Sequence, residues 1–221
     1  MSIERLDAAN RADVEAVAGL HSRYLADSPV VQFGPRFLRD FYYAALVRDG
    51  LIGVTLCRAD DRVIGFISYT ADPLGFMTVG VRRHGIKLAG VMAASVATRP
   101  GTARDIAHVL RLMRERRGEA ASGAPDNTGE VLSLVVDEAY RGYVPPGGKS
   151  RVAVRLFEAS QDFFREHGLG RVRLLVQPGN IESNLFCNAL GCEFEKITAG
   201  GGSVHRYTYS LPVEPAREVV S

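Results

Sequence analysis

The chain has 221 residues, of which 46 % are hydrophobic and 24 % charged, and its formal net charge is +2. These proportions are typical of a globular protein, and the small net charge gives no indication of nucleic-acid binding. No apolar run reaches the roughly 18 residues of a membrane span, and the N-terminus is too charged for a secretory signal. Three cysteines without a framework spacing favour a reducing compartment. We therefore expect a cytoplasmic protein with no transmembrane segment and no nucleic-acid partner.

The N-terminal part of the chain predicts a strand, two helices and a hairpin. Residues 3–6 are apolar enough for a strand, and Asn10 or Asp13 can cap the helix that follows. Pro35 opens a second helix, which ends at Gly50. Two further strands, at 51–58 and 62–69, flank a turn at Asp60-Asp61.

Residues 71–125 predict a helical insertion, or cap, within a single domain that covers residues 1–221. The segment is rich in basic residues and poor in acidic ones. Its apolar run at 86–96 favours helices that pack on the core or on a partner subunit, so a homodimer is one expected assembly. His84 and His108 have no metal-ligand spacing, and we interpret them as surface or cap residues.

The C-terminal part predicts the order strand, helix, strand, helix and hairpin. The strands are expected at 131–136, 172–176, 193–198 and 205–211, and the helices at 152–168 and 180–190. Together with the N-terminal elements, this order predicts an α/β (α+β) fold. Its central sheet is expected to be mixed and mostly antiparallel, with helices on both faces.

The connection at 137–151 is rich in glycine and basic residues, and it leads from an apolar strand into a helix. Free backbone N–H groups and the positive end of the dipole make such a helix start a phosphate site. A Walker A loop would explain Gly148-Lys149-Ser150, but Tyr143 stands where its first glycine should be. An ordinary basic connection between strand and helix is the alternative without a ligand.

The same connection resembles the GNAT superfamily of N-acetyltransferases. Their usual pattern is an apolar strand followed by V-x-P-x-Y-R-G, and Val136, Tyr140, Arg141 and Gly142 match it, with Glu138 in place of the proline. The following R/Q-x-x-G-x-G/A motif is altered, because Arg151-Val152-Ala153 occupies its G-x-G/A part and the loop is longer. A second family block, N-x-x-A-x-x-L-Y-x-x-x-G-F, is matched in spacing from Asn180 to Cys192, with Cys187 at the tyrosine position.

The resemblance implies acetyl-CoA as co-substrate and no metal. It places the pantetheine along the strand at 131–136 and the pyrophosphate on the loop and the following helix start. The residues implied in cofactor binding are Leu134, Val135, Val136, Arg141, Gly142, Gly147, Gly148, Lys149, Ser150, Arg151, Val152, Ala153, Asn180, Ser183 and Asn184.

The implied reaction needs two proton carriers. Glu130 is the carboxylate best placed in the sequence to act as the base. A solvated residue at the end of the strand is an equally good interpretation of Glu130. Cys187 takes the position of the usual acid, with an apolar core residue as the alternative, and Tyr207 or Tyr209 could supply a hydroxyl instead.

These implications give one leading hypothesis and two alternatives. The leading one is transfer of an acyl group, expected to be acetyl, from acyl-CoA to a primary amine. The amine attacks directly in a ternary complex. The basic insertion favours a small or anionic acceptor such as an amino sugar. The alternative interpretation of the insertion is a basic surface that is only solvated and binds no acceptor. The alternatives are a catalytically weak CoA-binding sensor or partner module of the same fold and a P-loop nucleotide-binding protein.

Overall fold

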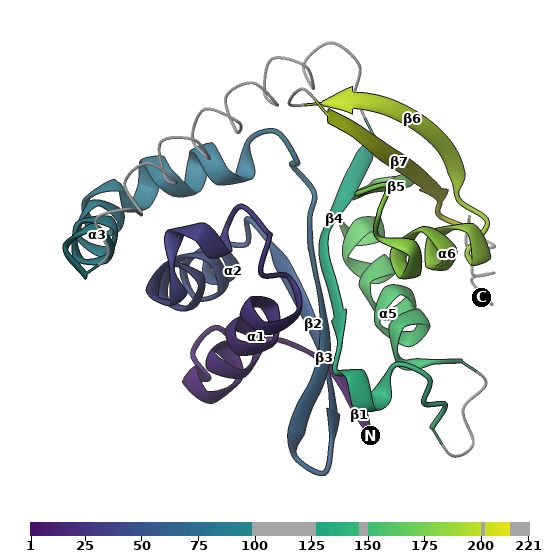
Figure 1. Ribbon diagram of the computed structural model, residues 1–221, viewed down its shortest axis with the longest axis horizontal. Coiled ribbons are helices and arrows are strands. Elements are labelled where there is room, and N and C mark those ends of the chain that lie inside the picture. The colour runs from purple at the N-terminus through teal and green to yellow at the C-terminus, as the bar shows by residue number, and fades with distance from the viewer. Residues whose placement is uncertain (99–126, 146–149, 200–201, 213–221) are drawn as a thin grey trace, which may run out of the picture.

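The computed structural model describes residues 1–98, 127–145, 150–199 and 202–212 (Figure 1). The predicted phosphate-loop residues Gly147, Gly148 and Lys149 lie outside the described residues, as do His108 and most of the basic insertion.

In the described part of the chain, seven strands form one sheet in the order β1-β2-β3-β4-β5-β7-β6. Only the β4–β5 pair is parallel, and every other neighbouring pair is antiparallel. The predicted mixed, mostly antiparallel sheet is therefore confirmed. The strands are β1 (Ser2–Arg5), β2 (Gly53–Ala59), β3 (Arg62–Thr70), β4 (Thr128–Val136), β5 (Arg171–Val176), β6 (Glu193–Ala199) and β7 (Gly202–Ser210).

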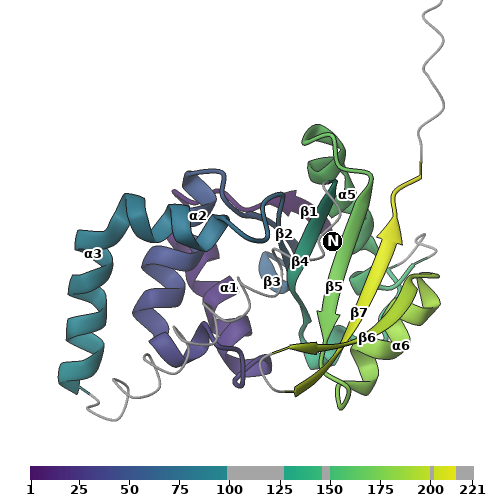
Figure 2. The same cartoon turned by 90° about the horizontal axis from the view of Figure 1, so that it is seen from above.

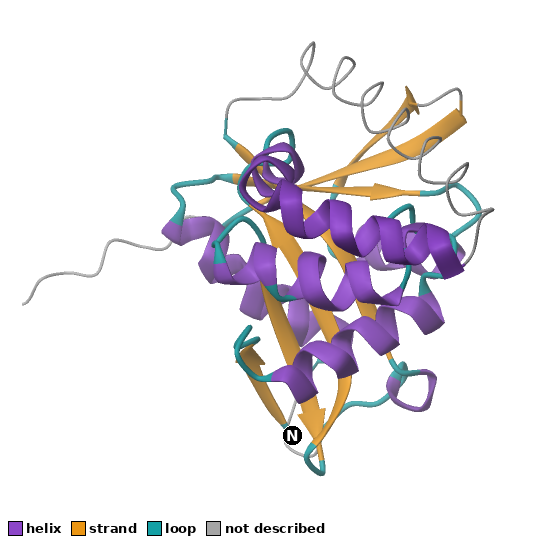
Figure 3. Cartoon of the chain, turned by 90° about the vertical axis from the view of Figure 1, so that its left-hand side faces the viewer, coloured by secondary structure: helices purple, strands orange, loops and turns teal. Residues whose placement is uncertain are grey.

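Helices cover both faces of this sheet, as Figure 2 shows from above and Figure 3 from the side of α1 to α3. One face carries α1 (Arg11–Tyr24), α2 (Ala45–Arg48) and α3 (Phe76–Thr98). The other carries α5 (Val152–Glu166) and α6 (Ile181–Ala189). As predicted, the Asn10 side chain caps α1 by accepting a hydrogen bond from the backbone N–H of Asp13.

Two hydrophobic clusters result, one on each face. The first joins the N-terminal helices to β2 and β3, with Leu38, Leu46 and Phe66 at its centre. The second joins α5 and α6 to β3, β4, β5 and β7, and Leu156 and Phe164 are fully buried in it. β4 contributes to both clusters, so its backbone lies between two packed layers.

The predicted second helix differs from a regular α-helix. Residues Phe37–Tyr43 form a π-helix, α2 follows after Ala44, and the N–H of Ala44 donates to the carbonyl of Arg39. This wider turn lets Tyr42 and Tyr43 both face inward, where each is at most 3 % exposed. The sequence predicted a helix from Pro35 to Gly50 but neither the π-helix nor the inward position of Tyr43.

The insertion begins as predicted, with a helix. α3 starts at Phe76, whose N–H bonds to the carbonyl of Asp72, and Phe76 and Leu88 pack into the first cluster. Among the described residues, no helix combines the length and the apolar character needed to cross a bilayer.

Candidate functional site

The sheet has an interruption between its two central strands. β4 pairs with β5 only from Thr128 to Val131, opposite Arg171 to Leu174. Both strands continue further, β4 to Val136 and β5 to Val176. The β5-facing backbone groups of Leu132–Val136 therefore have no partner strand in the described structure. Unpaired strand backbone of this kind can bind an extended ligand.

A β-bulge lies where this interruption begins. Ser68 of β3 faces Ser133 and Tyr69 faces Val131, so Leu132 is an extra residue without a partner on β3. A bulge leaves the extra residue outside the regular ladder and turns its backbone groups away from the neighbouring strand. The bulge thus lies at the junction where β4 and β5 separate, and it interrupts the β3–β4 ladder there.

On the face of α1 to α3, this junction carries a buried ion pair. The Nε atom of Arg173 lies 2.5 Å from Oε2 of Glu130, and the two side chains are 10 % and 13 % exposed. Val131, Val172 and Leu174 point to the opposite face, into the second cluster. Glu130, predicted as a strand-end carboxylate, lies within β4 and next to the bulge.

Tyr42 borders the same ion pair. Burial raises the pKa of Tyr42, and the nearby charge of Glu130 raises it further, so the phenol stays protonated. It is a neutral hydrogen-bonding group beside a charged pair.

On the other face, the junction carries Tyr207. This residue faces Leu174, the last β5 residue that pairs with β4. Its hydroxyl donates to Oδ1 of Asn184 at 2.9 Å, and Nδ1 of His205 lies 2.7 Å from the same oxygen. Burial raises the pKa of Tyr207, so its phenol also stays protonated. The sequence singled out Tyr207 only as one of two alternating tyrosines.

Cys187 is also buried on this face. It is 1 % exposed within the second cluster. Its interaction with Cys192, together with burial, raises the pKa of the Cys187 thiol. This environment agrees with the alternative of an apolar core residue. Tyr207 is equally buried, at 2 % exposed, and differs in that its hydroxyl has a side-chain hydrogen-bond partner at the junction.

The residues predicted on α6 all lie in its first turns. Asn180 is the N-cap, and its side chain accepts a hydrogen bond from the N–H of Ser183 at 3.1 Å. Asn184 donates to the carbonyl of Asn180 at 2.6 Å, which fixes its amide and leaves Oδ1 for Tyr207. These contacts hold the start of α6 beside β7.

The helix start at α5 has free donors, as predicted. Arg151 is its N-cap without any side-chain capping bond, and Val152 behind it is fully buried. The first backbone N–H groups of this 15-residue helix therefore lack side-chain acceptors within the described residues. Ser150 directly precedes this turn and Ala153 belongs to it, and the binding of a phosphate here stays a prediction.

Arg141 lies on the connection from β4 to α5. Nη1 of Arg141 contacts both carboxylate oxygens of Glu182 at 3.1 Å, and its guanidinium lies over the ring of Tyr24. Both charged side chains are exposed, and exposed pairs contribute little to stability. Gly142 follows in the same turn.

The basic residues at the start of the insertion are partly paired. Arg83 and His84 both contact Asp49, at 3.6 Å and 2.8 Å. Arg82 is exposed. These contacts tie α3 to the end of α2 and leave less positive charge for a ligand than the sequence suggests.

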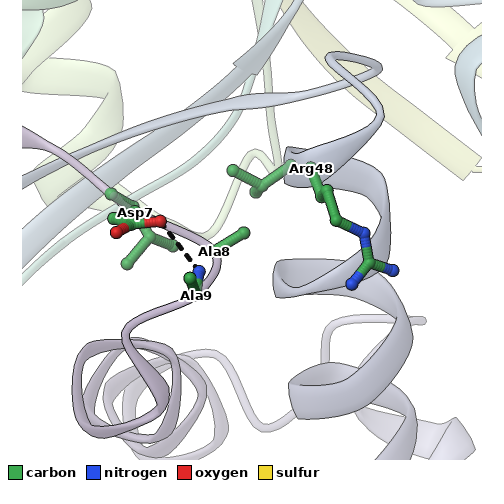
Figure 4. Close-up of a pocket in the computed structure, with 6 residues that line it drawn as sticks. Asp7, Ala8, Ala9 and Arg48 are labelled. Atoms are coloured by element: carbon green, nitrogen blue, oxygen red, sulfur yellow. Dashed lines mark hydrogen bonds between the residues drawn. The ribbon is translucent and has the colours of Figure 1, made fainter.

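A hollow of about 330 Å³ lies away from this junction, between the loop after β1 and the end of α2 (Figure 4). Asp7 accepts a hydrogen bond from the N–H of Ala9 there, and Arg48 extends away from Asp7. The rest of the lining is apolar: Leu6, Ala8 and Val47. The hollow therefore brings no pair of reactive side chains together.

No protein-family model matches the sequence, and no curated protein matches it. Solved structures do match the fold over nearly the whole chain. An aminoglycoside 6'-acetyltransferase type Ii superposes with a TM-score of 0.59 and 11 % identity, over 97 % of this chain and 100 % of that one. The chain has the GNAT fold.

Two further acetyltransferase structures also match the fold of this chain. A ribosomal-protein-alanine N-acetyltransferase from Brucella melitensis has a TM-score of 0.55 and 15 % identity, over 96 % of this chain and 100 % of that one. An aminoglycoside 6'-N-acetyltransferase complexed with coenzyme A has a TM-score of 0.56 and 11 % identity, over 97 % and 99 %. The GNAT resemblance of the sequence is thus confirmed at the level of the fold.

Proposed function

We propose that the protein transfers an acyl group from acyl-CoA to a primary amine. The observation that carries this proposal is the end of the β4–β5 pairing at Val131 and Leu174, together with the bulge at Leu132. An acyl-pantetheine arm has amide groups that can pair with the exposed backbone of Leu134 and Val136. Structures with the same fold include an acetyltransferase complexed with coenzyme A, which supports this assignment of the ligand.

The described residues fit the rest of acyl-CoA. The uncapped start of α5, at Ser150 to Ala153, offers backbone N–H donors for the pyrophosphate. Arg141 adds a positive charge once it leaves Glu182. The free main chain at the bulge can polarise the thioester carbonyl, as preorganised N–H donors do in acyl transfer. When bound, acyl-CoA supplies an activated carbonyl carbon.

The acceptor amine reaches this carbon from the face of α1 to α3. Attack forms the amide C–N bond and breaks the thioester C–S bond, so one proton must leave the amine and one must reach the sulfur. Glu130 lies on the acceptor face at the junction and accepts the amine proton, directly or through water. The proton for the sulfur comes from the other face, where Tyr207 has a protonated phenol. In this scheme Cys187 supports packing and has no part in proton transfer.

The first test is binding followed by turnover. Calorimetric titration should show binding of CoA and acetyl-CoA and no binding of ATP, whose binding would favour the P-loop alternative. Release of free thiol in the presence of an amine panel then separates an enzyme from a CoA-binding sensor. Binding of CoA without thiol release for any amine would contradict the proposed transfer.

The second test concerns the proton donor. Tyr207→Phe keeps the ring and removes the hydroxyl, so kcat should fall roughly 100-fold while CoA binding stays unchanged. Tyr209→Phe is the matched control, because Tyr209 lies on the same strand and packs against Phe157 on the same face. Cys187→Ala should leave kcat within about twofold of the native rate. A kcat that falls with Cys187→Ala and not with Tyr207→Phe would return the acid role to the thiol.

A further inference from the structure

The ion pair at the β4–β5 junction has unused hydrogen-bonding capacity. Arg173 is 8 % exposed, yet its one hydrogen bond in the described structure is the Nε contact to Glu130. A guanidinium has five N–H donors, and the Nη nitrogens of Arg173 are not among the fully buried side-chain atoms of the described residues that lack a partner, so they remain accessible. An arginine that served only to join two strands would be expected to meet further acceptors. The Nη edge of Arg173 is therefore available to a ligand on the acceptor face.

The edge has the geometry and position of an anion site. Planar guanidinium donors match the two oxygens of a carboxylate. Glu130 lies on β4 and Arg173 on β5, so a ligand group over each is separated by about one strand spacing, roughly 5 Å. Glu130 attracts an ammonium group, and Arg173 attracts an oxyanion beside it.

The charges of the pair cancel, which limits the acceptors that fit. A polyamine would place extra positive charge against Arg173, and a polyanion would place negative charge against Glu130. A zwitterion complements both groups at once. Tyr42, protonated at the border of the pair, adds a neutral hydrogen-bonding group without changing this balance.

From these contacts we infer that the acceptor is an amino acid or a close analogue, with a carboxylate near the amine that is acylated. Arg173 binds the carboxylate and Glu130 lies at the amine. The inference rests on the proposed acyl transfer, and it assigns the anion-binding role to Arg173 instead of the basic insertion.

The test compares each acid with its carboxamide. Thiol release from acetyl-CoA is measured with the common L-amino acids, with β-alanine and γ-aminobutyrate, and with the carboxamide of each. We expect at least one acid to have a kcat/KM about 10- to 100-fold above that of its carboxamide, in keeping with hydrogen bonds to a charged group. Arg173→Gln should remove this preference by raising the KM of the acid, and Arg173→Lys should restore it in part.

The matched control is Arg206→Gln. Arg206 also pairs with a glutamate, Glu195 at 3.0 Å, on the same sheet face, but the pair is 28 % and 61 % exposed and joins β7 to β6, one strand beyond β5. This variant should keep the native preference. Calorimetric binding of CoA to each variant shows that the fold and the cofactor site persist.

The ratio of kcat/KM between an acid and its carboxamide separates two effects of replacing Arg173. Loss of carboxylate binding lowers the ratio, whereas an indirect effect on Glu130 would slow both acceptors alike and leave the ratio unchanged. Equal rates for acids and carboxamides in the native protein, or a preference that survives Arg173→Gln, would overturn the inference and leave the acyl transfer intact. A polyamine that outcompetes every amino acid would overturn it as well. Absence of thiol release with every amine, neutral ones included, would instead count against the proposed function.

Discussion

His21 gives the sharpest prediction about stability. Its side chain is fully buried, Nδ1 contacts the hydroxyl of Tyr43, and Nε2 has no hydrogen-bond partner in the described structure. Burial lowers the pKa of His21 from 6.5 to about 4. The folded protein therefore holds this imidazole neutral at a pH where the unfolded chain binds a proton.

The sign and size of the effect follow from linkage. Because the folded pKa is the lower one, the stability is fully present above pH 6.5 and is lost as the pH falls toward 4. One pKa unit corresponds to about 1.4 kcal/mol, so His21 should remove about 2 kcal/mol of unfolding free energy between pH 7 and pH 5. The loss should reach about 3 kcal/mol at pH 4.

Urea unfolding at pH 7 and pH 5 measures this contribution. His21→Gln removes the titrating group, so its unfolding free energy should change less over this range than that of the native protein, by about 2 kcal/mol. His167→Gln, which replaces an exposed histidine at the end of α5, should retain the native pH dependence. An identical pH dependence in the native protein and His21→Gln would refute the reasoning.

Two further predictions concern contacts within the helical layer and the sheet. Tyr43→Phe removes the hydroxyl that meets Nδ1 of His21 and should cost about 1 to 3 kcal/mol in urea unfolding, because a buried nitrogen loses its partner. An unchanged midpoint would show that the contact contributes nothing. Gly65→Ala should lower stability by about 1 to 3 kcal/mol and weaken CoA binding, because its Cβ would lie 2.8 Å from the carbonyl oxygen of Val135 on β4. Gly19→Ala on the exposed side of α1 meets no atom within 4 Å and should instead raise the midpoint, so a gain from both substitutions would contradict the close packing of β3 on β4.

The sequence predicted most of the fold because the element signals were local. Three such signals agree with the structure: the cap at Asn10, the hairpin turn at Asp60-Asp61 and the helix start after Arg151. The GNAT resemblance rested on two sequence blocks that do contact each other in the structure, through Arg141 and Glu182. The π-helix could not be predicted, since a single extra residue per turn leaves the apolar pattern almost unchanged.

The site could be predicted only in part. Glu130 was selected for its place before an apolar strand, but its pairing with Arg173 depends on the register of two strands far apart in the sequence. Tyr207 and Asn184 meet for the same reason. Cys187 was selected from the motif spacing, which gives the position of a residue on α6 but not its burial in the second cluster.

The bulge at Leu132 also determines which side of the sheet receives the carboxylate. Side chains alternate along a strand, so a single extra residue exchanges the two sides for everything before it. Leu134 and Val136 pack in the second cluster, and a regular strand would place Glu130 there with them. With Leu132 as an extra residue, Val131 packs in the second cluster instead, and Glu130 lies on the opposite face, where it pairs with Arg173. Deleting this one leucine would move the charge from the acceptor side into the apolar layer beneath α5, without altering a single reactive group.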